Sequence, residues 1–217
     1  MLRRSLFKLF IASALAMAAP LSFALDVGKD FTLIQPAQPG GTNGQVEVIE
    51  FFSYGCSHCG ALEPKLTKWR AAQDKDVVFR RVPVSFGRPE WAALGRVYFT
   101  LNAMGLSDKL DAKVFEGIHK EYLKLADEKV RNEWVTKQGV DVKKFNDTWR
   151  SFGVETQVRR AEQMAEAYRV QSVPALIVDG RYMPTDSGVK GEDAGHTRVL
   201  VNTDQLIAKV RAEKPKK

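Results

Sequence analysis

The stretch VEVIEFFSYGCSHCG, residues 46–60, organises the chain and contains both of its cysteines, Cys56 and Cys59. Its near-continuous apolar opening, Val46 to Phe52, predicts a central strand that is buried on both faces. Residues 57–72 are predicted to form the helix that follows. Two cysteines three positions apart at the start of a helix lie one turn from each other. Their sulfurs can therefore close a small disulfide without moving the backbone.

The two cysteines are predicted to differ in reactivity. Cys56 would lie at the helix N-terminus, where free N–H groups and the helix dipole stabilise a thiolate, whereas Cys59 receives less of that help. Thiol–disulfide exchange needs this asymmetry between an attacking and a resolving cysteine. A ring this small restrains little of the unfolded chain, which favours a reactive over a structural disulfide.

The N-terminus has the pattern of a secretory signal peptide over residues 1–24. A basic segment, residues 2–8, precedes an apolar run, residues 9–21. Small residues in Ser22-Phe23-Ala24 predict cleavage after Ala24. The apolar run is shorter than the roughly 20 residues of a spanning helix. We therefore expect an exported protein in an oxidising compartment.

Removal of the signal peptide leaves a chain with a mild positive charge. The mature chain would have 193 residues (217 minus 24) and a net charge of +4 (+7 minus the three basic residues of the signal peptide). The basic cluster Lys214-Pro215-Lys216-Lys217 is expected to be a solvated tail. Neither feature predicts a nucleic-acid partner, and the sequence offers no cofactor motif.

The order of the predicted elements indicates an α/β fold with an inserted all-α segment. A strand at 76–83 completes a parallel βαβ unit. Residues 89–152 carry helical spacing without strand signals and are predicted to form three or four helices, with Trp91, Trp134 and Trp149 in their core. We therefore expect a domain made of residues 25–88 and 153–217, interrupted by a helical domain at 89–152.

The C-terminal part is predicted to return to the sheet. A helix at 155–168 precedes the strand 173–178, and Asp179-Gly180 is a two-residue hairpin turn into 181–183. A hairpin after a parallel unit makes the sheet mixed. A last helix is expected at 203–213, with Asn202 or Thr203 as its N-cap.

Two motifs together resemble the DsbA family of bacterial periplasmic thiol:disulfide oxidoreductases, which belongs to the thioredoxin-like superfamily. They are FFSYGCSHC, residues 51–59, and SVPA, residues 172–175. The resemblance covers essentially the whole mature chain. It implies a thioredoxin-like fold with a helical insertion. It also implies donation of a disulfide to newly exported proteins, with reoxidation by a DsbB-type membrane partner.

The resemblance also implies roles for individual residues. Cys56 and Cys59 would be the redox pair, with His58 stabilising the Cys56 thiolate. Glu50 matches the acid that moves a proton to or from the resolving cysteine, although pairing with Arg80 or Arg81 is an alternative for it. Val173-Pro174 would form a cis-proline loop that faces the disulfide and binds the incoming peptide.

One position departs from the family pattern, in which a proline usually precedes the histidine between the cysteines. Here Ser57 takes that place, and the sequence does not determine how this changes the oxidising power. His119 and His196 lack ligand spacing and are expected to be surface or hydrogen-bonded polar residues.

Two alternatives to a disulfide oxidase remain. A disulfide isomerase or reductase of the same superfamily would use the same motif. Isomerases of this kind carry a separate dimerisation domain before the catalytic one. Only about 20 residues lie between Ala24 and the first strong strand, fewer than the ~50 of a typical domain. We therefore expect a monomeric oxidase.

A metal-binding module is the second alternative, with Cys56, His58 and Cys59 as ligands. A structural zinc site needs four ligands, and the sequence offers no second pair at similar spacing. A c-type haem site needs a histidine directly after the second cysteine, where this chain has Gly60. We therefore expect no bound metal.

Overall fold

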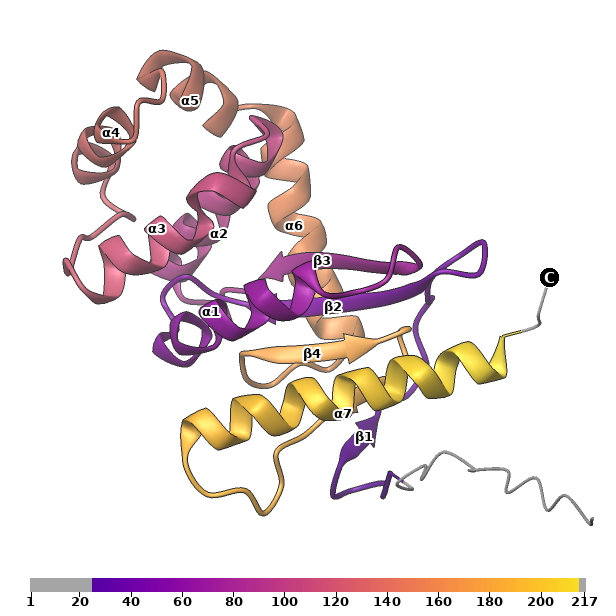
Figure 1. The fold of residues 1–217 in the computed structure, drawn as a ribbon. Helices are drawn as coiled ribbons and strands as arrows, with labels where there is room; N and C mark the ends of the chain where they lie inside the picture. Colours follow the sequence, from indigo (N-terminus) through magenta and orange to yellow (C-terminus); the bar gives the residue numbers. More distant parts are fainter. Residues whose placement is uncertain (1–24, 215–217) are drawn as a thin grey trace, which may run out of the picture.

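The computed structural model describes residues 25–214, so the predicted signal peptide lies outside the described residues. Within this range one mixed sheet has the strand order β1-β5-β4-β2-β3 (Figure 1). The strands are β1 Phe31–Leu33, β2 Val46–Phe52, β3 Val77–Pro83, β4 Ala175–Val178 and β5 Tyr182–Pro184. The helices are α1 Ser57–Ala71, α2 Pro89–Ala103, α3 Ser107–His119, α4 Glu128–Lys137, α5 Val142–Trp149, α6 Phe152–Ala167 and α7 Glu192–Glu213.

Strand β2 is an internal strand of the sheet, and its residues are almost all buried, as its apolar sequence predicts. It pairs with β3 in parallel and with β4 in antiparallel orientation, which confirms the mixed sheet. Side chains alternate between the two faces of a strand. Val46 and Val48 therefore pack with α1 and α7, whereas Ile49 and Phe51 pack on the other face, in a cluster that includes residues of α6. Glu50 alternates in step with Val46 and Val48, so its side chain points to the face covered by α1.

The helices between β3 and β4 form the upper part of the molecule in Figure 1. Helices α2 to α5 fall within the segment predicted to be helical. Helix α6 runs from them back to the sheet, where it packs against β3, and is followed by β4. One buried apolar cluster joins both parts, because it contains Phe51 of β2 as well as Leu110 of α3 and Phe145 of α5. The division into two domains at residues 89 and 152 stays a prediction.

The hairpin between β4 and β5 has the predicted turn. Asp179 and Gly180 both have positive φ, 52° and 67°, as a type I′ turn requires. The Arg181 N–H closes the turn by donating to the Val178 carbonyl. The turn returns the chain to the sheet edge, where β5 pairs with β1.

The last helix differs from its prediction at its start. Helix α7 begins at Glu192, so the expectation that Asn202 or Thr203 caps a helix at 203 was wrong. Both residues lie within α7, and their side chains are buried against the rest of the protein. The Asn202 side-chain amide donates to the carbonyl oxygens of Asp30 and Thr185. The glycine and histidine in the early turns are poor helix formers, which concealed this part of the helix from sequence reasoning. No helix within residues 25–214 is long and apolar enough to cross a membrane.

Candidate functional site

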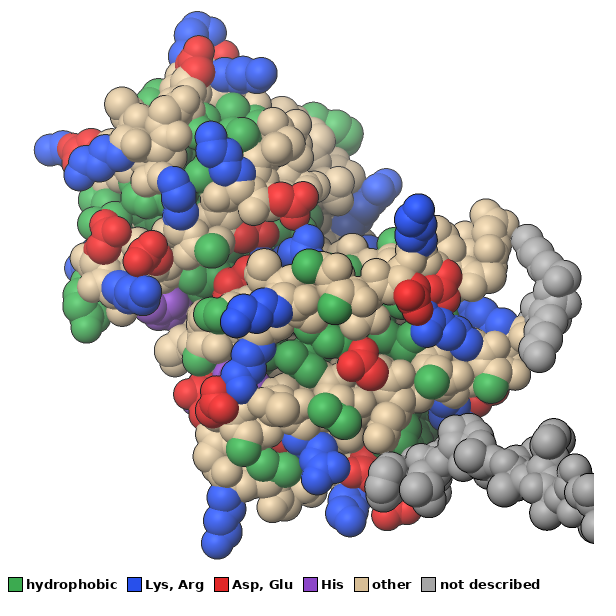
Figure 2. All heavy atoms as spheres, in the orientation of Figure 1, with side chains coloured by type: hydrophobic (Ala, Val, Ile, Leu, Met, Phe, Trp, Pro, Cys, Tyr) green, Lys and Arg blue, Asp and Glu red, His purple; other side chains and the backbone are tan. Residues whose placement is uncertain are grey.

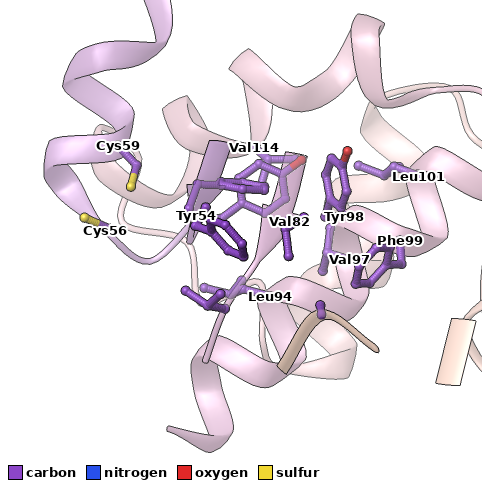
Figure 3. Close-up of a cluster of buried hydrophobic side chains, with 14 of the residues drawn as sticks. Tyr54, Cys56, Cys59, Val82, Leu94, Val97, Tyr98, Phe99, Leu101 and Val114 are labelled. Carbon is purple, nitrogen blue, oxygen red and sulfur yellow. The ribbon is translucent and has the colours of Figure 1, made fainter. Parts of the chain in front are cut away.

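The two cysteines lie where β2 ends and α1 begins. Cys56 is the N-cap of α1 with an extended backbone, φ −92° and ψ 116°, and Cys59 lies in the first turn. Figure 3 shows both sulfurs at the edge of a cluster of buried side chains that includes Tyr54. The loop requires a glycine at Gly55, because a Cβ there would lie 2.5 Å from Nε1 of Trp91. Trp91, predicted as a core residue, is partly buried and packs against this loop.

The surroundings of the two thiols make them chemically different. Both are free thiols; Cys56 is 7% exposed and Cys59 is fully buried. The hydrogen bond from the Cys59 thiol, with help from the backbone N–H groups of Cys59 and His58, lowers the pKa of Cys56 to about 6. Burial and the hydrogen bond to Cys56 raise the pKa of Cys59 well above its ordinary value. The accessible sulfur is thus the one that is stable as a thiolate at neutral pH.

The proline loop lies against Cys56. The Val173–Pro174 peptide bond is cis, which confirms the predicted conformation. When Cys56 is protonated, its thiol donates to the Val173 carbonyl oxygen, with 3.4 Å between sulfur and oxygen. The backbone of this loop therefore lies next to the Cys56 sulfur.

His58 is exposed and has an acidic partner that sequence reasoning missed. Its Nδ1 is hydrogen-bonded to Oε1 of Glu192, in the first turn of α7. The hydrogen bond and charge of Glu192 raise the pKa of His58, and the nearby Cys56 acts in the same direction. The two residues are 134 positions apart, and no local pattern in the sequence connects them.

Glu50 lies in the interior, on the face of β2 that carries α1. It is fully buried, and Arg81 Nε donates to its Oε2 at 2.6 Å. Burial outweighs the attraction of Arg81 and raises the pKa of Glu50 to about 7. Its Oε1 has no hydrogen-bond partner within the described part of the chain. The carboxyl group is therefore both paired with Arg81 and poised to take up a proton. Arg80, the other candidate partner, pairs with Glu47.

Arg81 is the centre of a buried charge cluster that we define as Glu50, Glu63, Arg81 and Asp111. Besides Glu50, the guanidinium donates to Glu63 of α1 and to Asp111 of α3. The hydroxyl of Tyr54, two residues before Cys56, donates to the same Asp111. Burial raises the pKa of Asp111. Sequence reasoning missed Glu63, Asp111 and Tyr54; only the pairing of β2 with β3 places Arg81 opposite Glu50.

A cleft of about 500 Å³ opens beside the cysteines. Its lining includes His58, Val173, Pro174, Met183, Glu192 and His196. The cleft thus combines the cis-proline loop with the polar rim formed by α1 and α7. Within residues 25–214 no group of His, Cys, Asp or Glu side chains is arranged to hold a metal ion.

The comparison with known families agrees with this geometry. Residues 47–197 match the DSBA-like thioredoxin domain. The chain belongs to the DsbA family. A relative from Bordetella parapertussis, named thiol:disulfide interchange protein DsbA, is 40% identical over 205 residues, which are 93% of this chain and 96% of the relative. A protein of the same name from Pseudomonas aeruginosa is 36% identical over 209 residues, which are 94% of this chain and 97% of the relative.

Solved structures show the same relationship. The crystal structure of Pseudomonas aeruginosa DsbA superposes with a TM-score of 0.77 at 36% identity, over 86% of this chain and 94% of that one. The oxidoreductase DsbA from Xylella fastidiosa superposes with a TM-score of 0.77 at 31% identity, over 87% of this chain and 100% of that one. The predicted thioredoxin-like α/β fold and the family assignment are therefore confirmed. The chain is a thiol:disulfide oxidoreductase with a Cys56–Cys59 motif.

Proposed function

We propose that this oxidoreductase works as a disulfide donor: its Cys56–Cys59 disulfide passes to reduced, newly exported proteins in the periplasm. The single observation that supports this direction is the asymmetry of the two thiols. A Cys56 thiolate that is stable at neutral pH makes the reduced form favourable, so the disulfide is a strong oxidant.

The chemistry balances through two exchange steps. A substrate thiolate attacks the Cys56 sulfur, the S–S bond breaks, and Cys59 leaves with the electron pair. Because the buried Cys59 thiolate is unfavourable, it takes a proton, and Glu50 is the acid positioned to supply one. A second substrate thiolate then attacks the substrate sulfur, and Cys56 leaves as a thiolate. The substrate is oxidised by two electrons and the Cys56–Cys59 pair is reduced.

We assign the remaining residues to binding and to charge. Val173 and Pro174 bind the backbone of the substrate beside Cys56, because extended peptides pair with exposed backbone edges. His58 stabilises the Cys56 thiolate through its positive charge.

The cycle must close with an external oxidant. We propose that a DsbB-type membrane oxidase removes the two electrons from reduced Cys56 and Cys59. The protein acts as a monomer after export and removal of residues 1–24.

The redox equilibrium of the protein in glutathione buffers, followed by thiol trapping, tests the proposed direction. A reduction potential well above that of the glutathione pool is expected of a donor. A potential near that of thioredoxin would contradict the proposal, because the same fold would then act as a reductase.

A further inference from the structure

The first turn of α7 lies against the N-terminus of α1, at the rim of the cleft. Glu192 in that turn pairs with His58, and the next residue, Asp193, pairs with Lys65 of α1 at 2.8 Å. The N-terminus of α7 is thus tied to α1 at two places, and only one of them involves the histidine between the cysteines. In Figure 2 the visible histidine side chains lie toward the left edge of the molecule, where acidic and basic side chains are also exposed.

The charged groups around His58 come from both helices. On its own helix His58 faces Cys56, and across the rim it faces Glu192. His196, one turn along α7, lies 4.0 Å from the same Glu192 oxygen but is more buried, with 12% of its side chain exposed. Lys65 and Asp186 act on His196 at longer range. Burial lowers the pKa of His196, so at neutral pH Glu192 shares its charge chiefly with His58.

We propose that Glu192 is a positioning residue that holds His58 as the imidazolium beside the Cys56 thiolate and so sets the pH range over which the cysteine pair is oxidising. The inference rests on the proposed function as a disulfide donor, which it extends to a residue outside the C-x-x-C motif and the proline loop.

The protonation of His58 depends on Glu192 more in the disulfide state than in the reduced state. In the reduced state the Cys56 thiolate itself attracts a proton onto His58. In the disulfide state that negative charge is gone, and Glu192 is the acidic group in hydrogen-bond contact with the ring. With Glu192 present, His58 therefore keeps its proton to higher pH in both states. Without it, His58 would lose its proton in the disulfide state above about pH 6.5, the ordinary pKa of a histidine.

This difference changes the proton balance of the reaction. Around neutral pH, reduction of the native disulfide by two electrons places one proton on Cys59 and leaves Cys56 as a thiolate. In a Glu192→Gln protein above about pH 6.5, reduction would also place a proton on His58. A reaction that takes up an additional proton becomes less favourable as the pH rises, so the oxidising power of the variant falls more steeply with pH.

The test compares Glu192→Gln with the native protein by measuring the glutathione equilibrium from pH 5.5 to 8. Because the pair is exposed, we expect an equilibrium constant that differs by about two- to fivefold at pH 8 and converges toward the native value at pH 5.5. Asp193→Asn is the matched control, since it removes the same charge one residue along and leaves the His58 contact in place. The equilibrium constant of Asp193→Asn should change with pH in the same way as that of the native protein. A parallel profile for Glu192→Gln would overturn the proposal.

A second readout does not depend on oxidase activity. In the disulfide form, NMR titration of the His58 ring should show proton loss at lower pH in Glu192→Gln than in the native protein or in Asp193→Asn. In a double-mutant cycle, Glu192→Gln should add no pH dependence once His58 is replaced by Gln. An unchanged His58 titration would overturn the inference even if the protein proves to be a donor. A thioredoxin-like potential would contradict the donor function while leaving the His58 titration interpretable.

Discussion

The charged pair beside Cys56 is exposed to solvent, whereas the charge cluster around Arg81, on the side of Cys59, is buried. His58 and Glu192 have 67% and 46% of their side chains exposed, whereas Arg81 and Glu50 have 2% and 0%. Water screens the first pair, so it contributes little to folding and can respond to pH and to a bound substrate. The buried cluster is not screened, so each charge there depends on its partner. The exposed pair can tune reactivity, whereas the buried cluster also determines stability.

The largest expected effect is on the cysteines themselves. Cys56→Ser should abolish disulfide donation, because it removes the more exposed of the two sulfurs, which is the proposed point of attack. The matched variant Cys59→Ser keeps that sulfur but removes the resolving thiol, so it should accumulate mixed disulfides with substrates. Gel electrophoresis would show them as bands of higher mass that vanish on reduction. Mixed disulfides that accumulate in Cys56→Ser and not in Cys59→Ser would show that the two cysteines are assigned in the wrong order.

The buried cluster should dominate stability. Arg81→Met leaves Glu50, Glu63 and Asp111 without their shared cation, which should cost about 3–5 kcal/mol in the free energy of unfolding. Arg80→Met is the matched control on the same strand, because Arg80 is 39% exposed and pairs with Glu47. It should cost less than about 1 kcal/mol. Urea denaturation measures both, and equal losses would remove the contrast between buried and exposed charges.

Glu50 should give the protein a pH-dependent stability. Its pKa in the folded protein is raised from 4.5 to about 7, so the folded state binds a proton more tightly than the unfolded state. The contribution is fully present below about pH 4.5 and is lost as the pH rises through 7; it amounts to about 3 kcal/mol. In Glu50→Gln this component is absent, and urea denaturation from pH 4 to 8 should show a flatter profile. Parallel profiles would mean that Glu50 does not titrate in this range.

The smallest effect on stability is expected at the exposed pair. Glu192→Gln should change the free energy of unfolding by less than about 1 kcal/mol at pH 7, because both side chains are solvated. Thermal unfolding of Glu192→Gln and of Arg81→Met, measured side by side, would compare the stability contributed by the exposed pair with that contributed by the buried cluster. A loss for Glu192→Gln as large as that for Arg81→Met would show that the contact holds α7 in place rather than adjusting the charge on His58.

Features that depend on neighbouring residues could be predicted from the sequence, whereas most contacts between distant segments could not. Sequence reasoning placed Cys56 at a helix N-terminus and Pro174 in a cis bond, and it gave Arg81 as one of two candidate partners for Glu50. It missed Glu192 because it started the last helix eleven residues too late, at 203 instead of 192. It missed Glu63, Asp111 and Tyr54 because the cluster they form draws on α1, α3 and the loop after β2 around one residue of β3.

By itself, the sequence determined the features that depend on neighbours along the chain. The apolar run of β2 and the spacing of Cys56 and Cys59 together specify a redox pair at a helix N-terminus, because backbone periodicity acts over a few residues. Tertiary structure decided which groups surround that pair; Glu50 and the Val173-Pro174 loop were expected there only from the family resemblance. Cys56 meets Val173 across 117 positions, and His58 meets Glu192 across 134. Such contacts follow from strand register and helix packing, which the burial of the whole core determines.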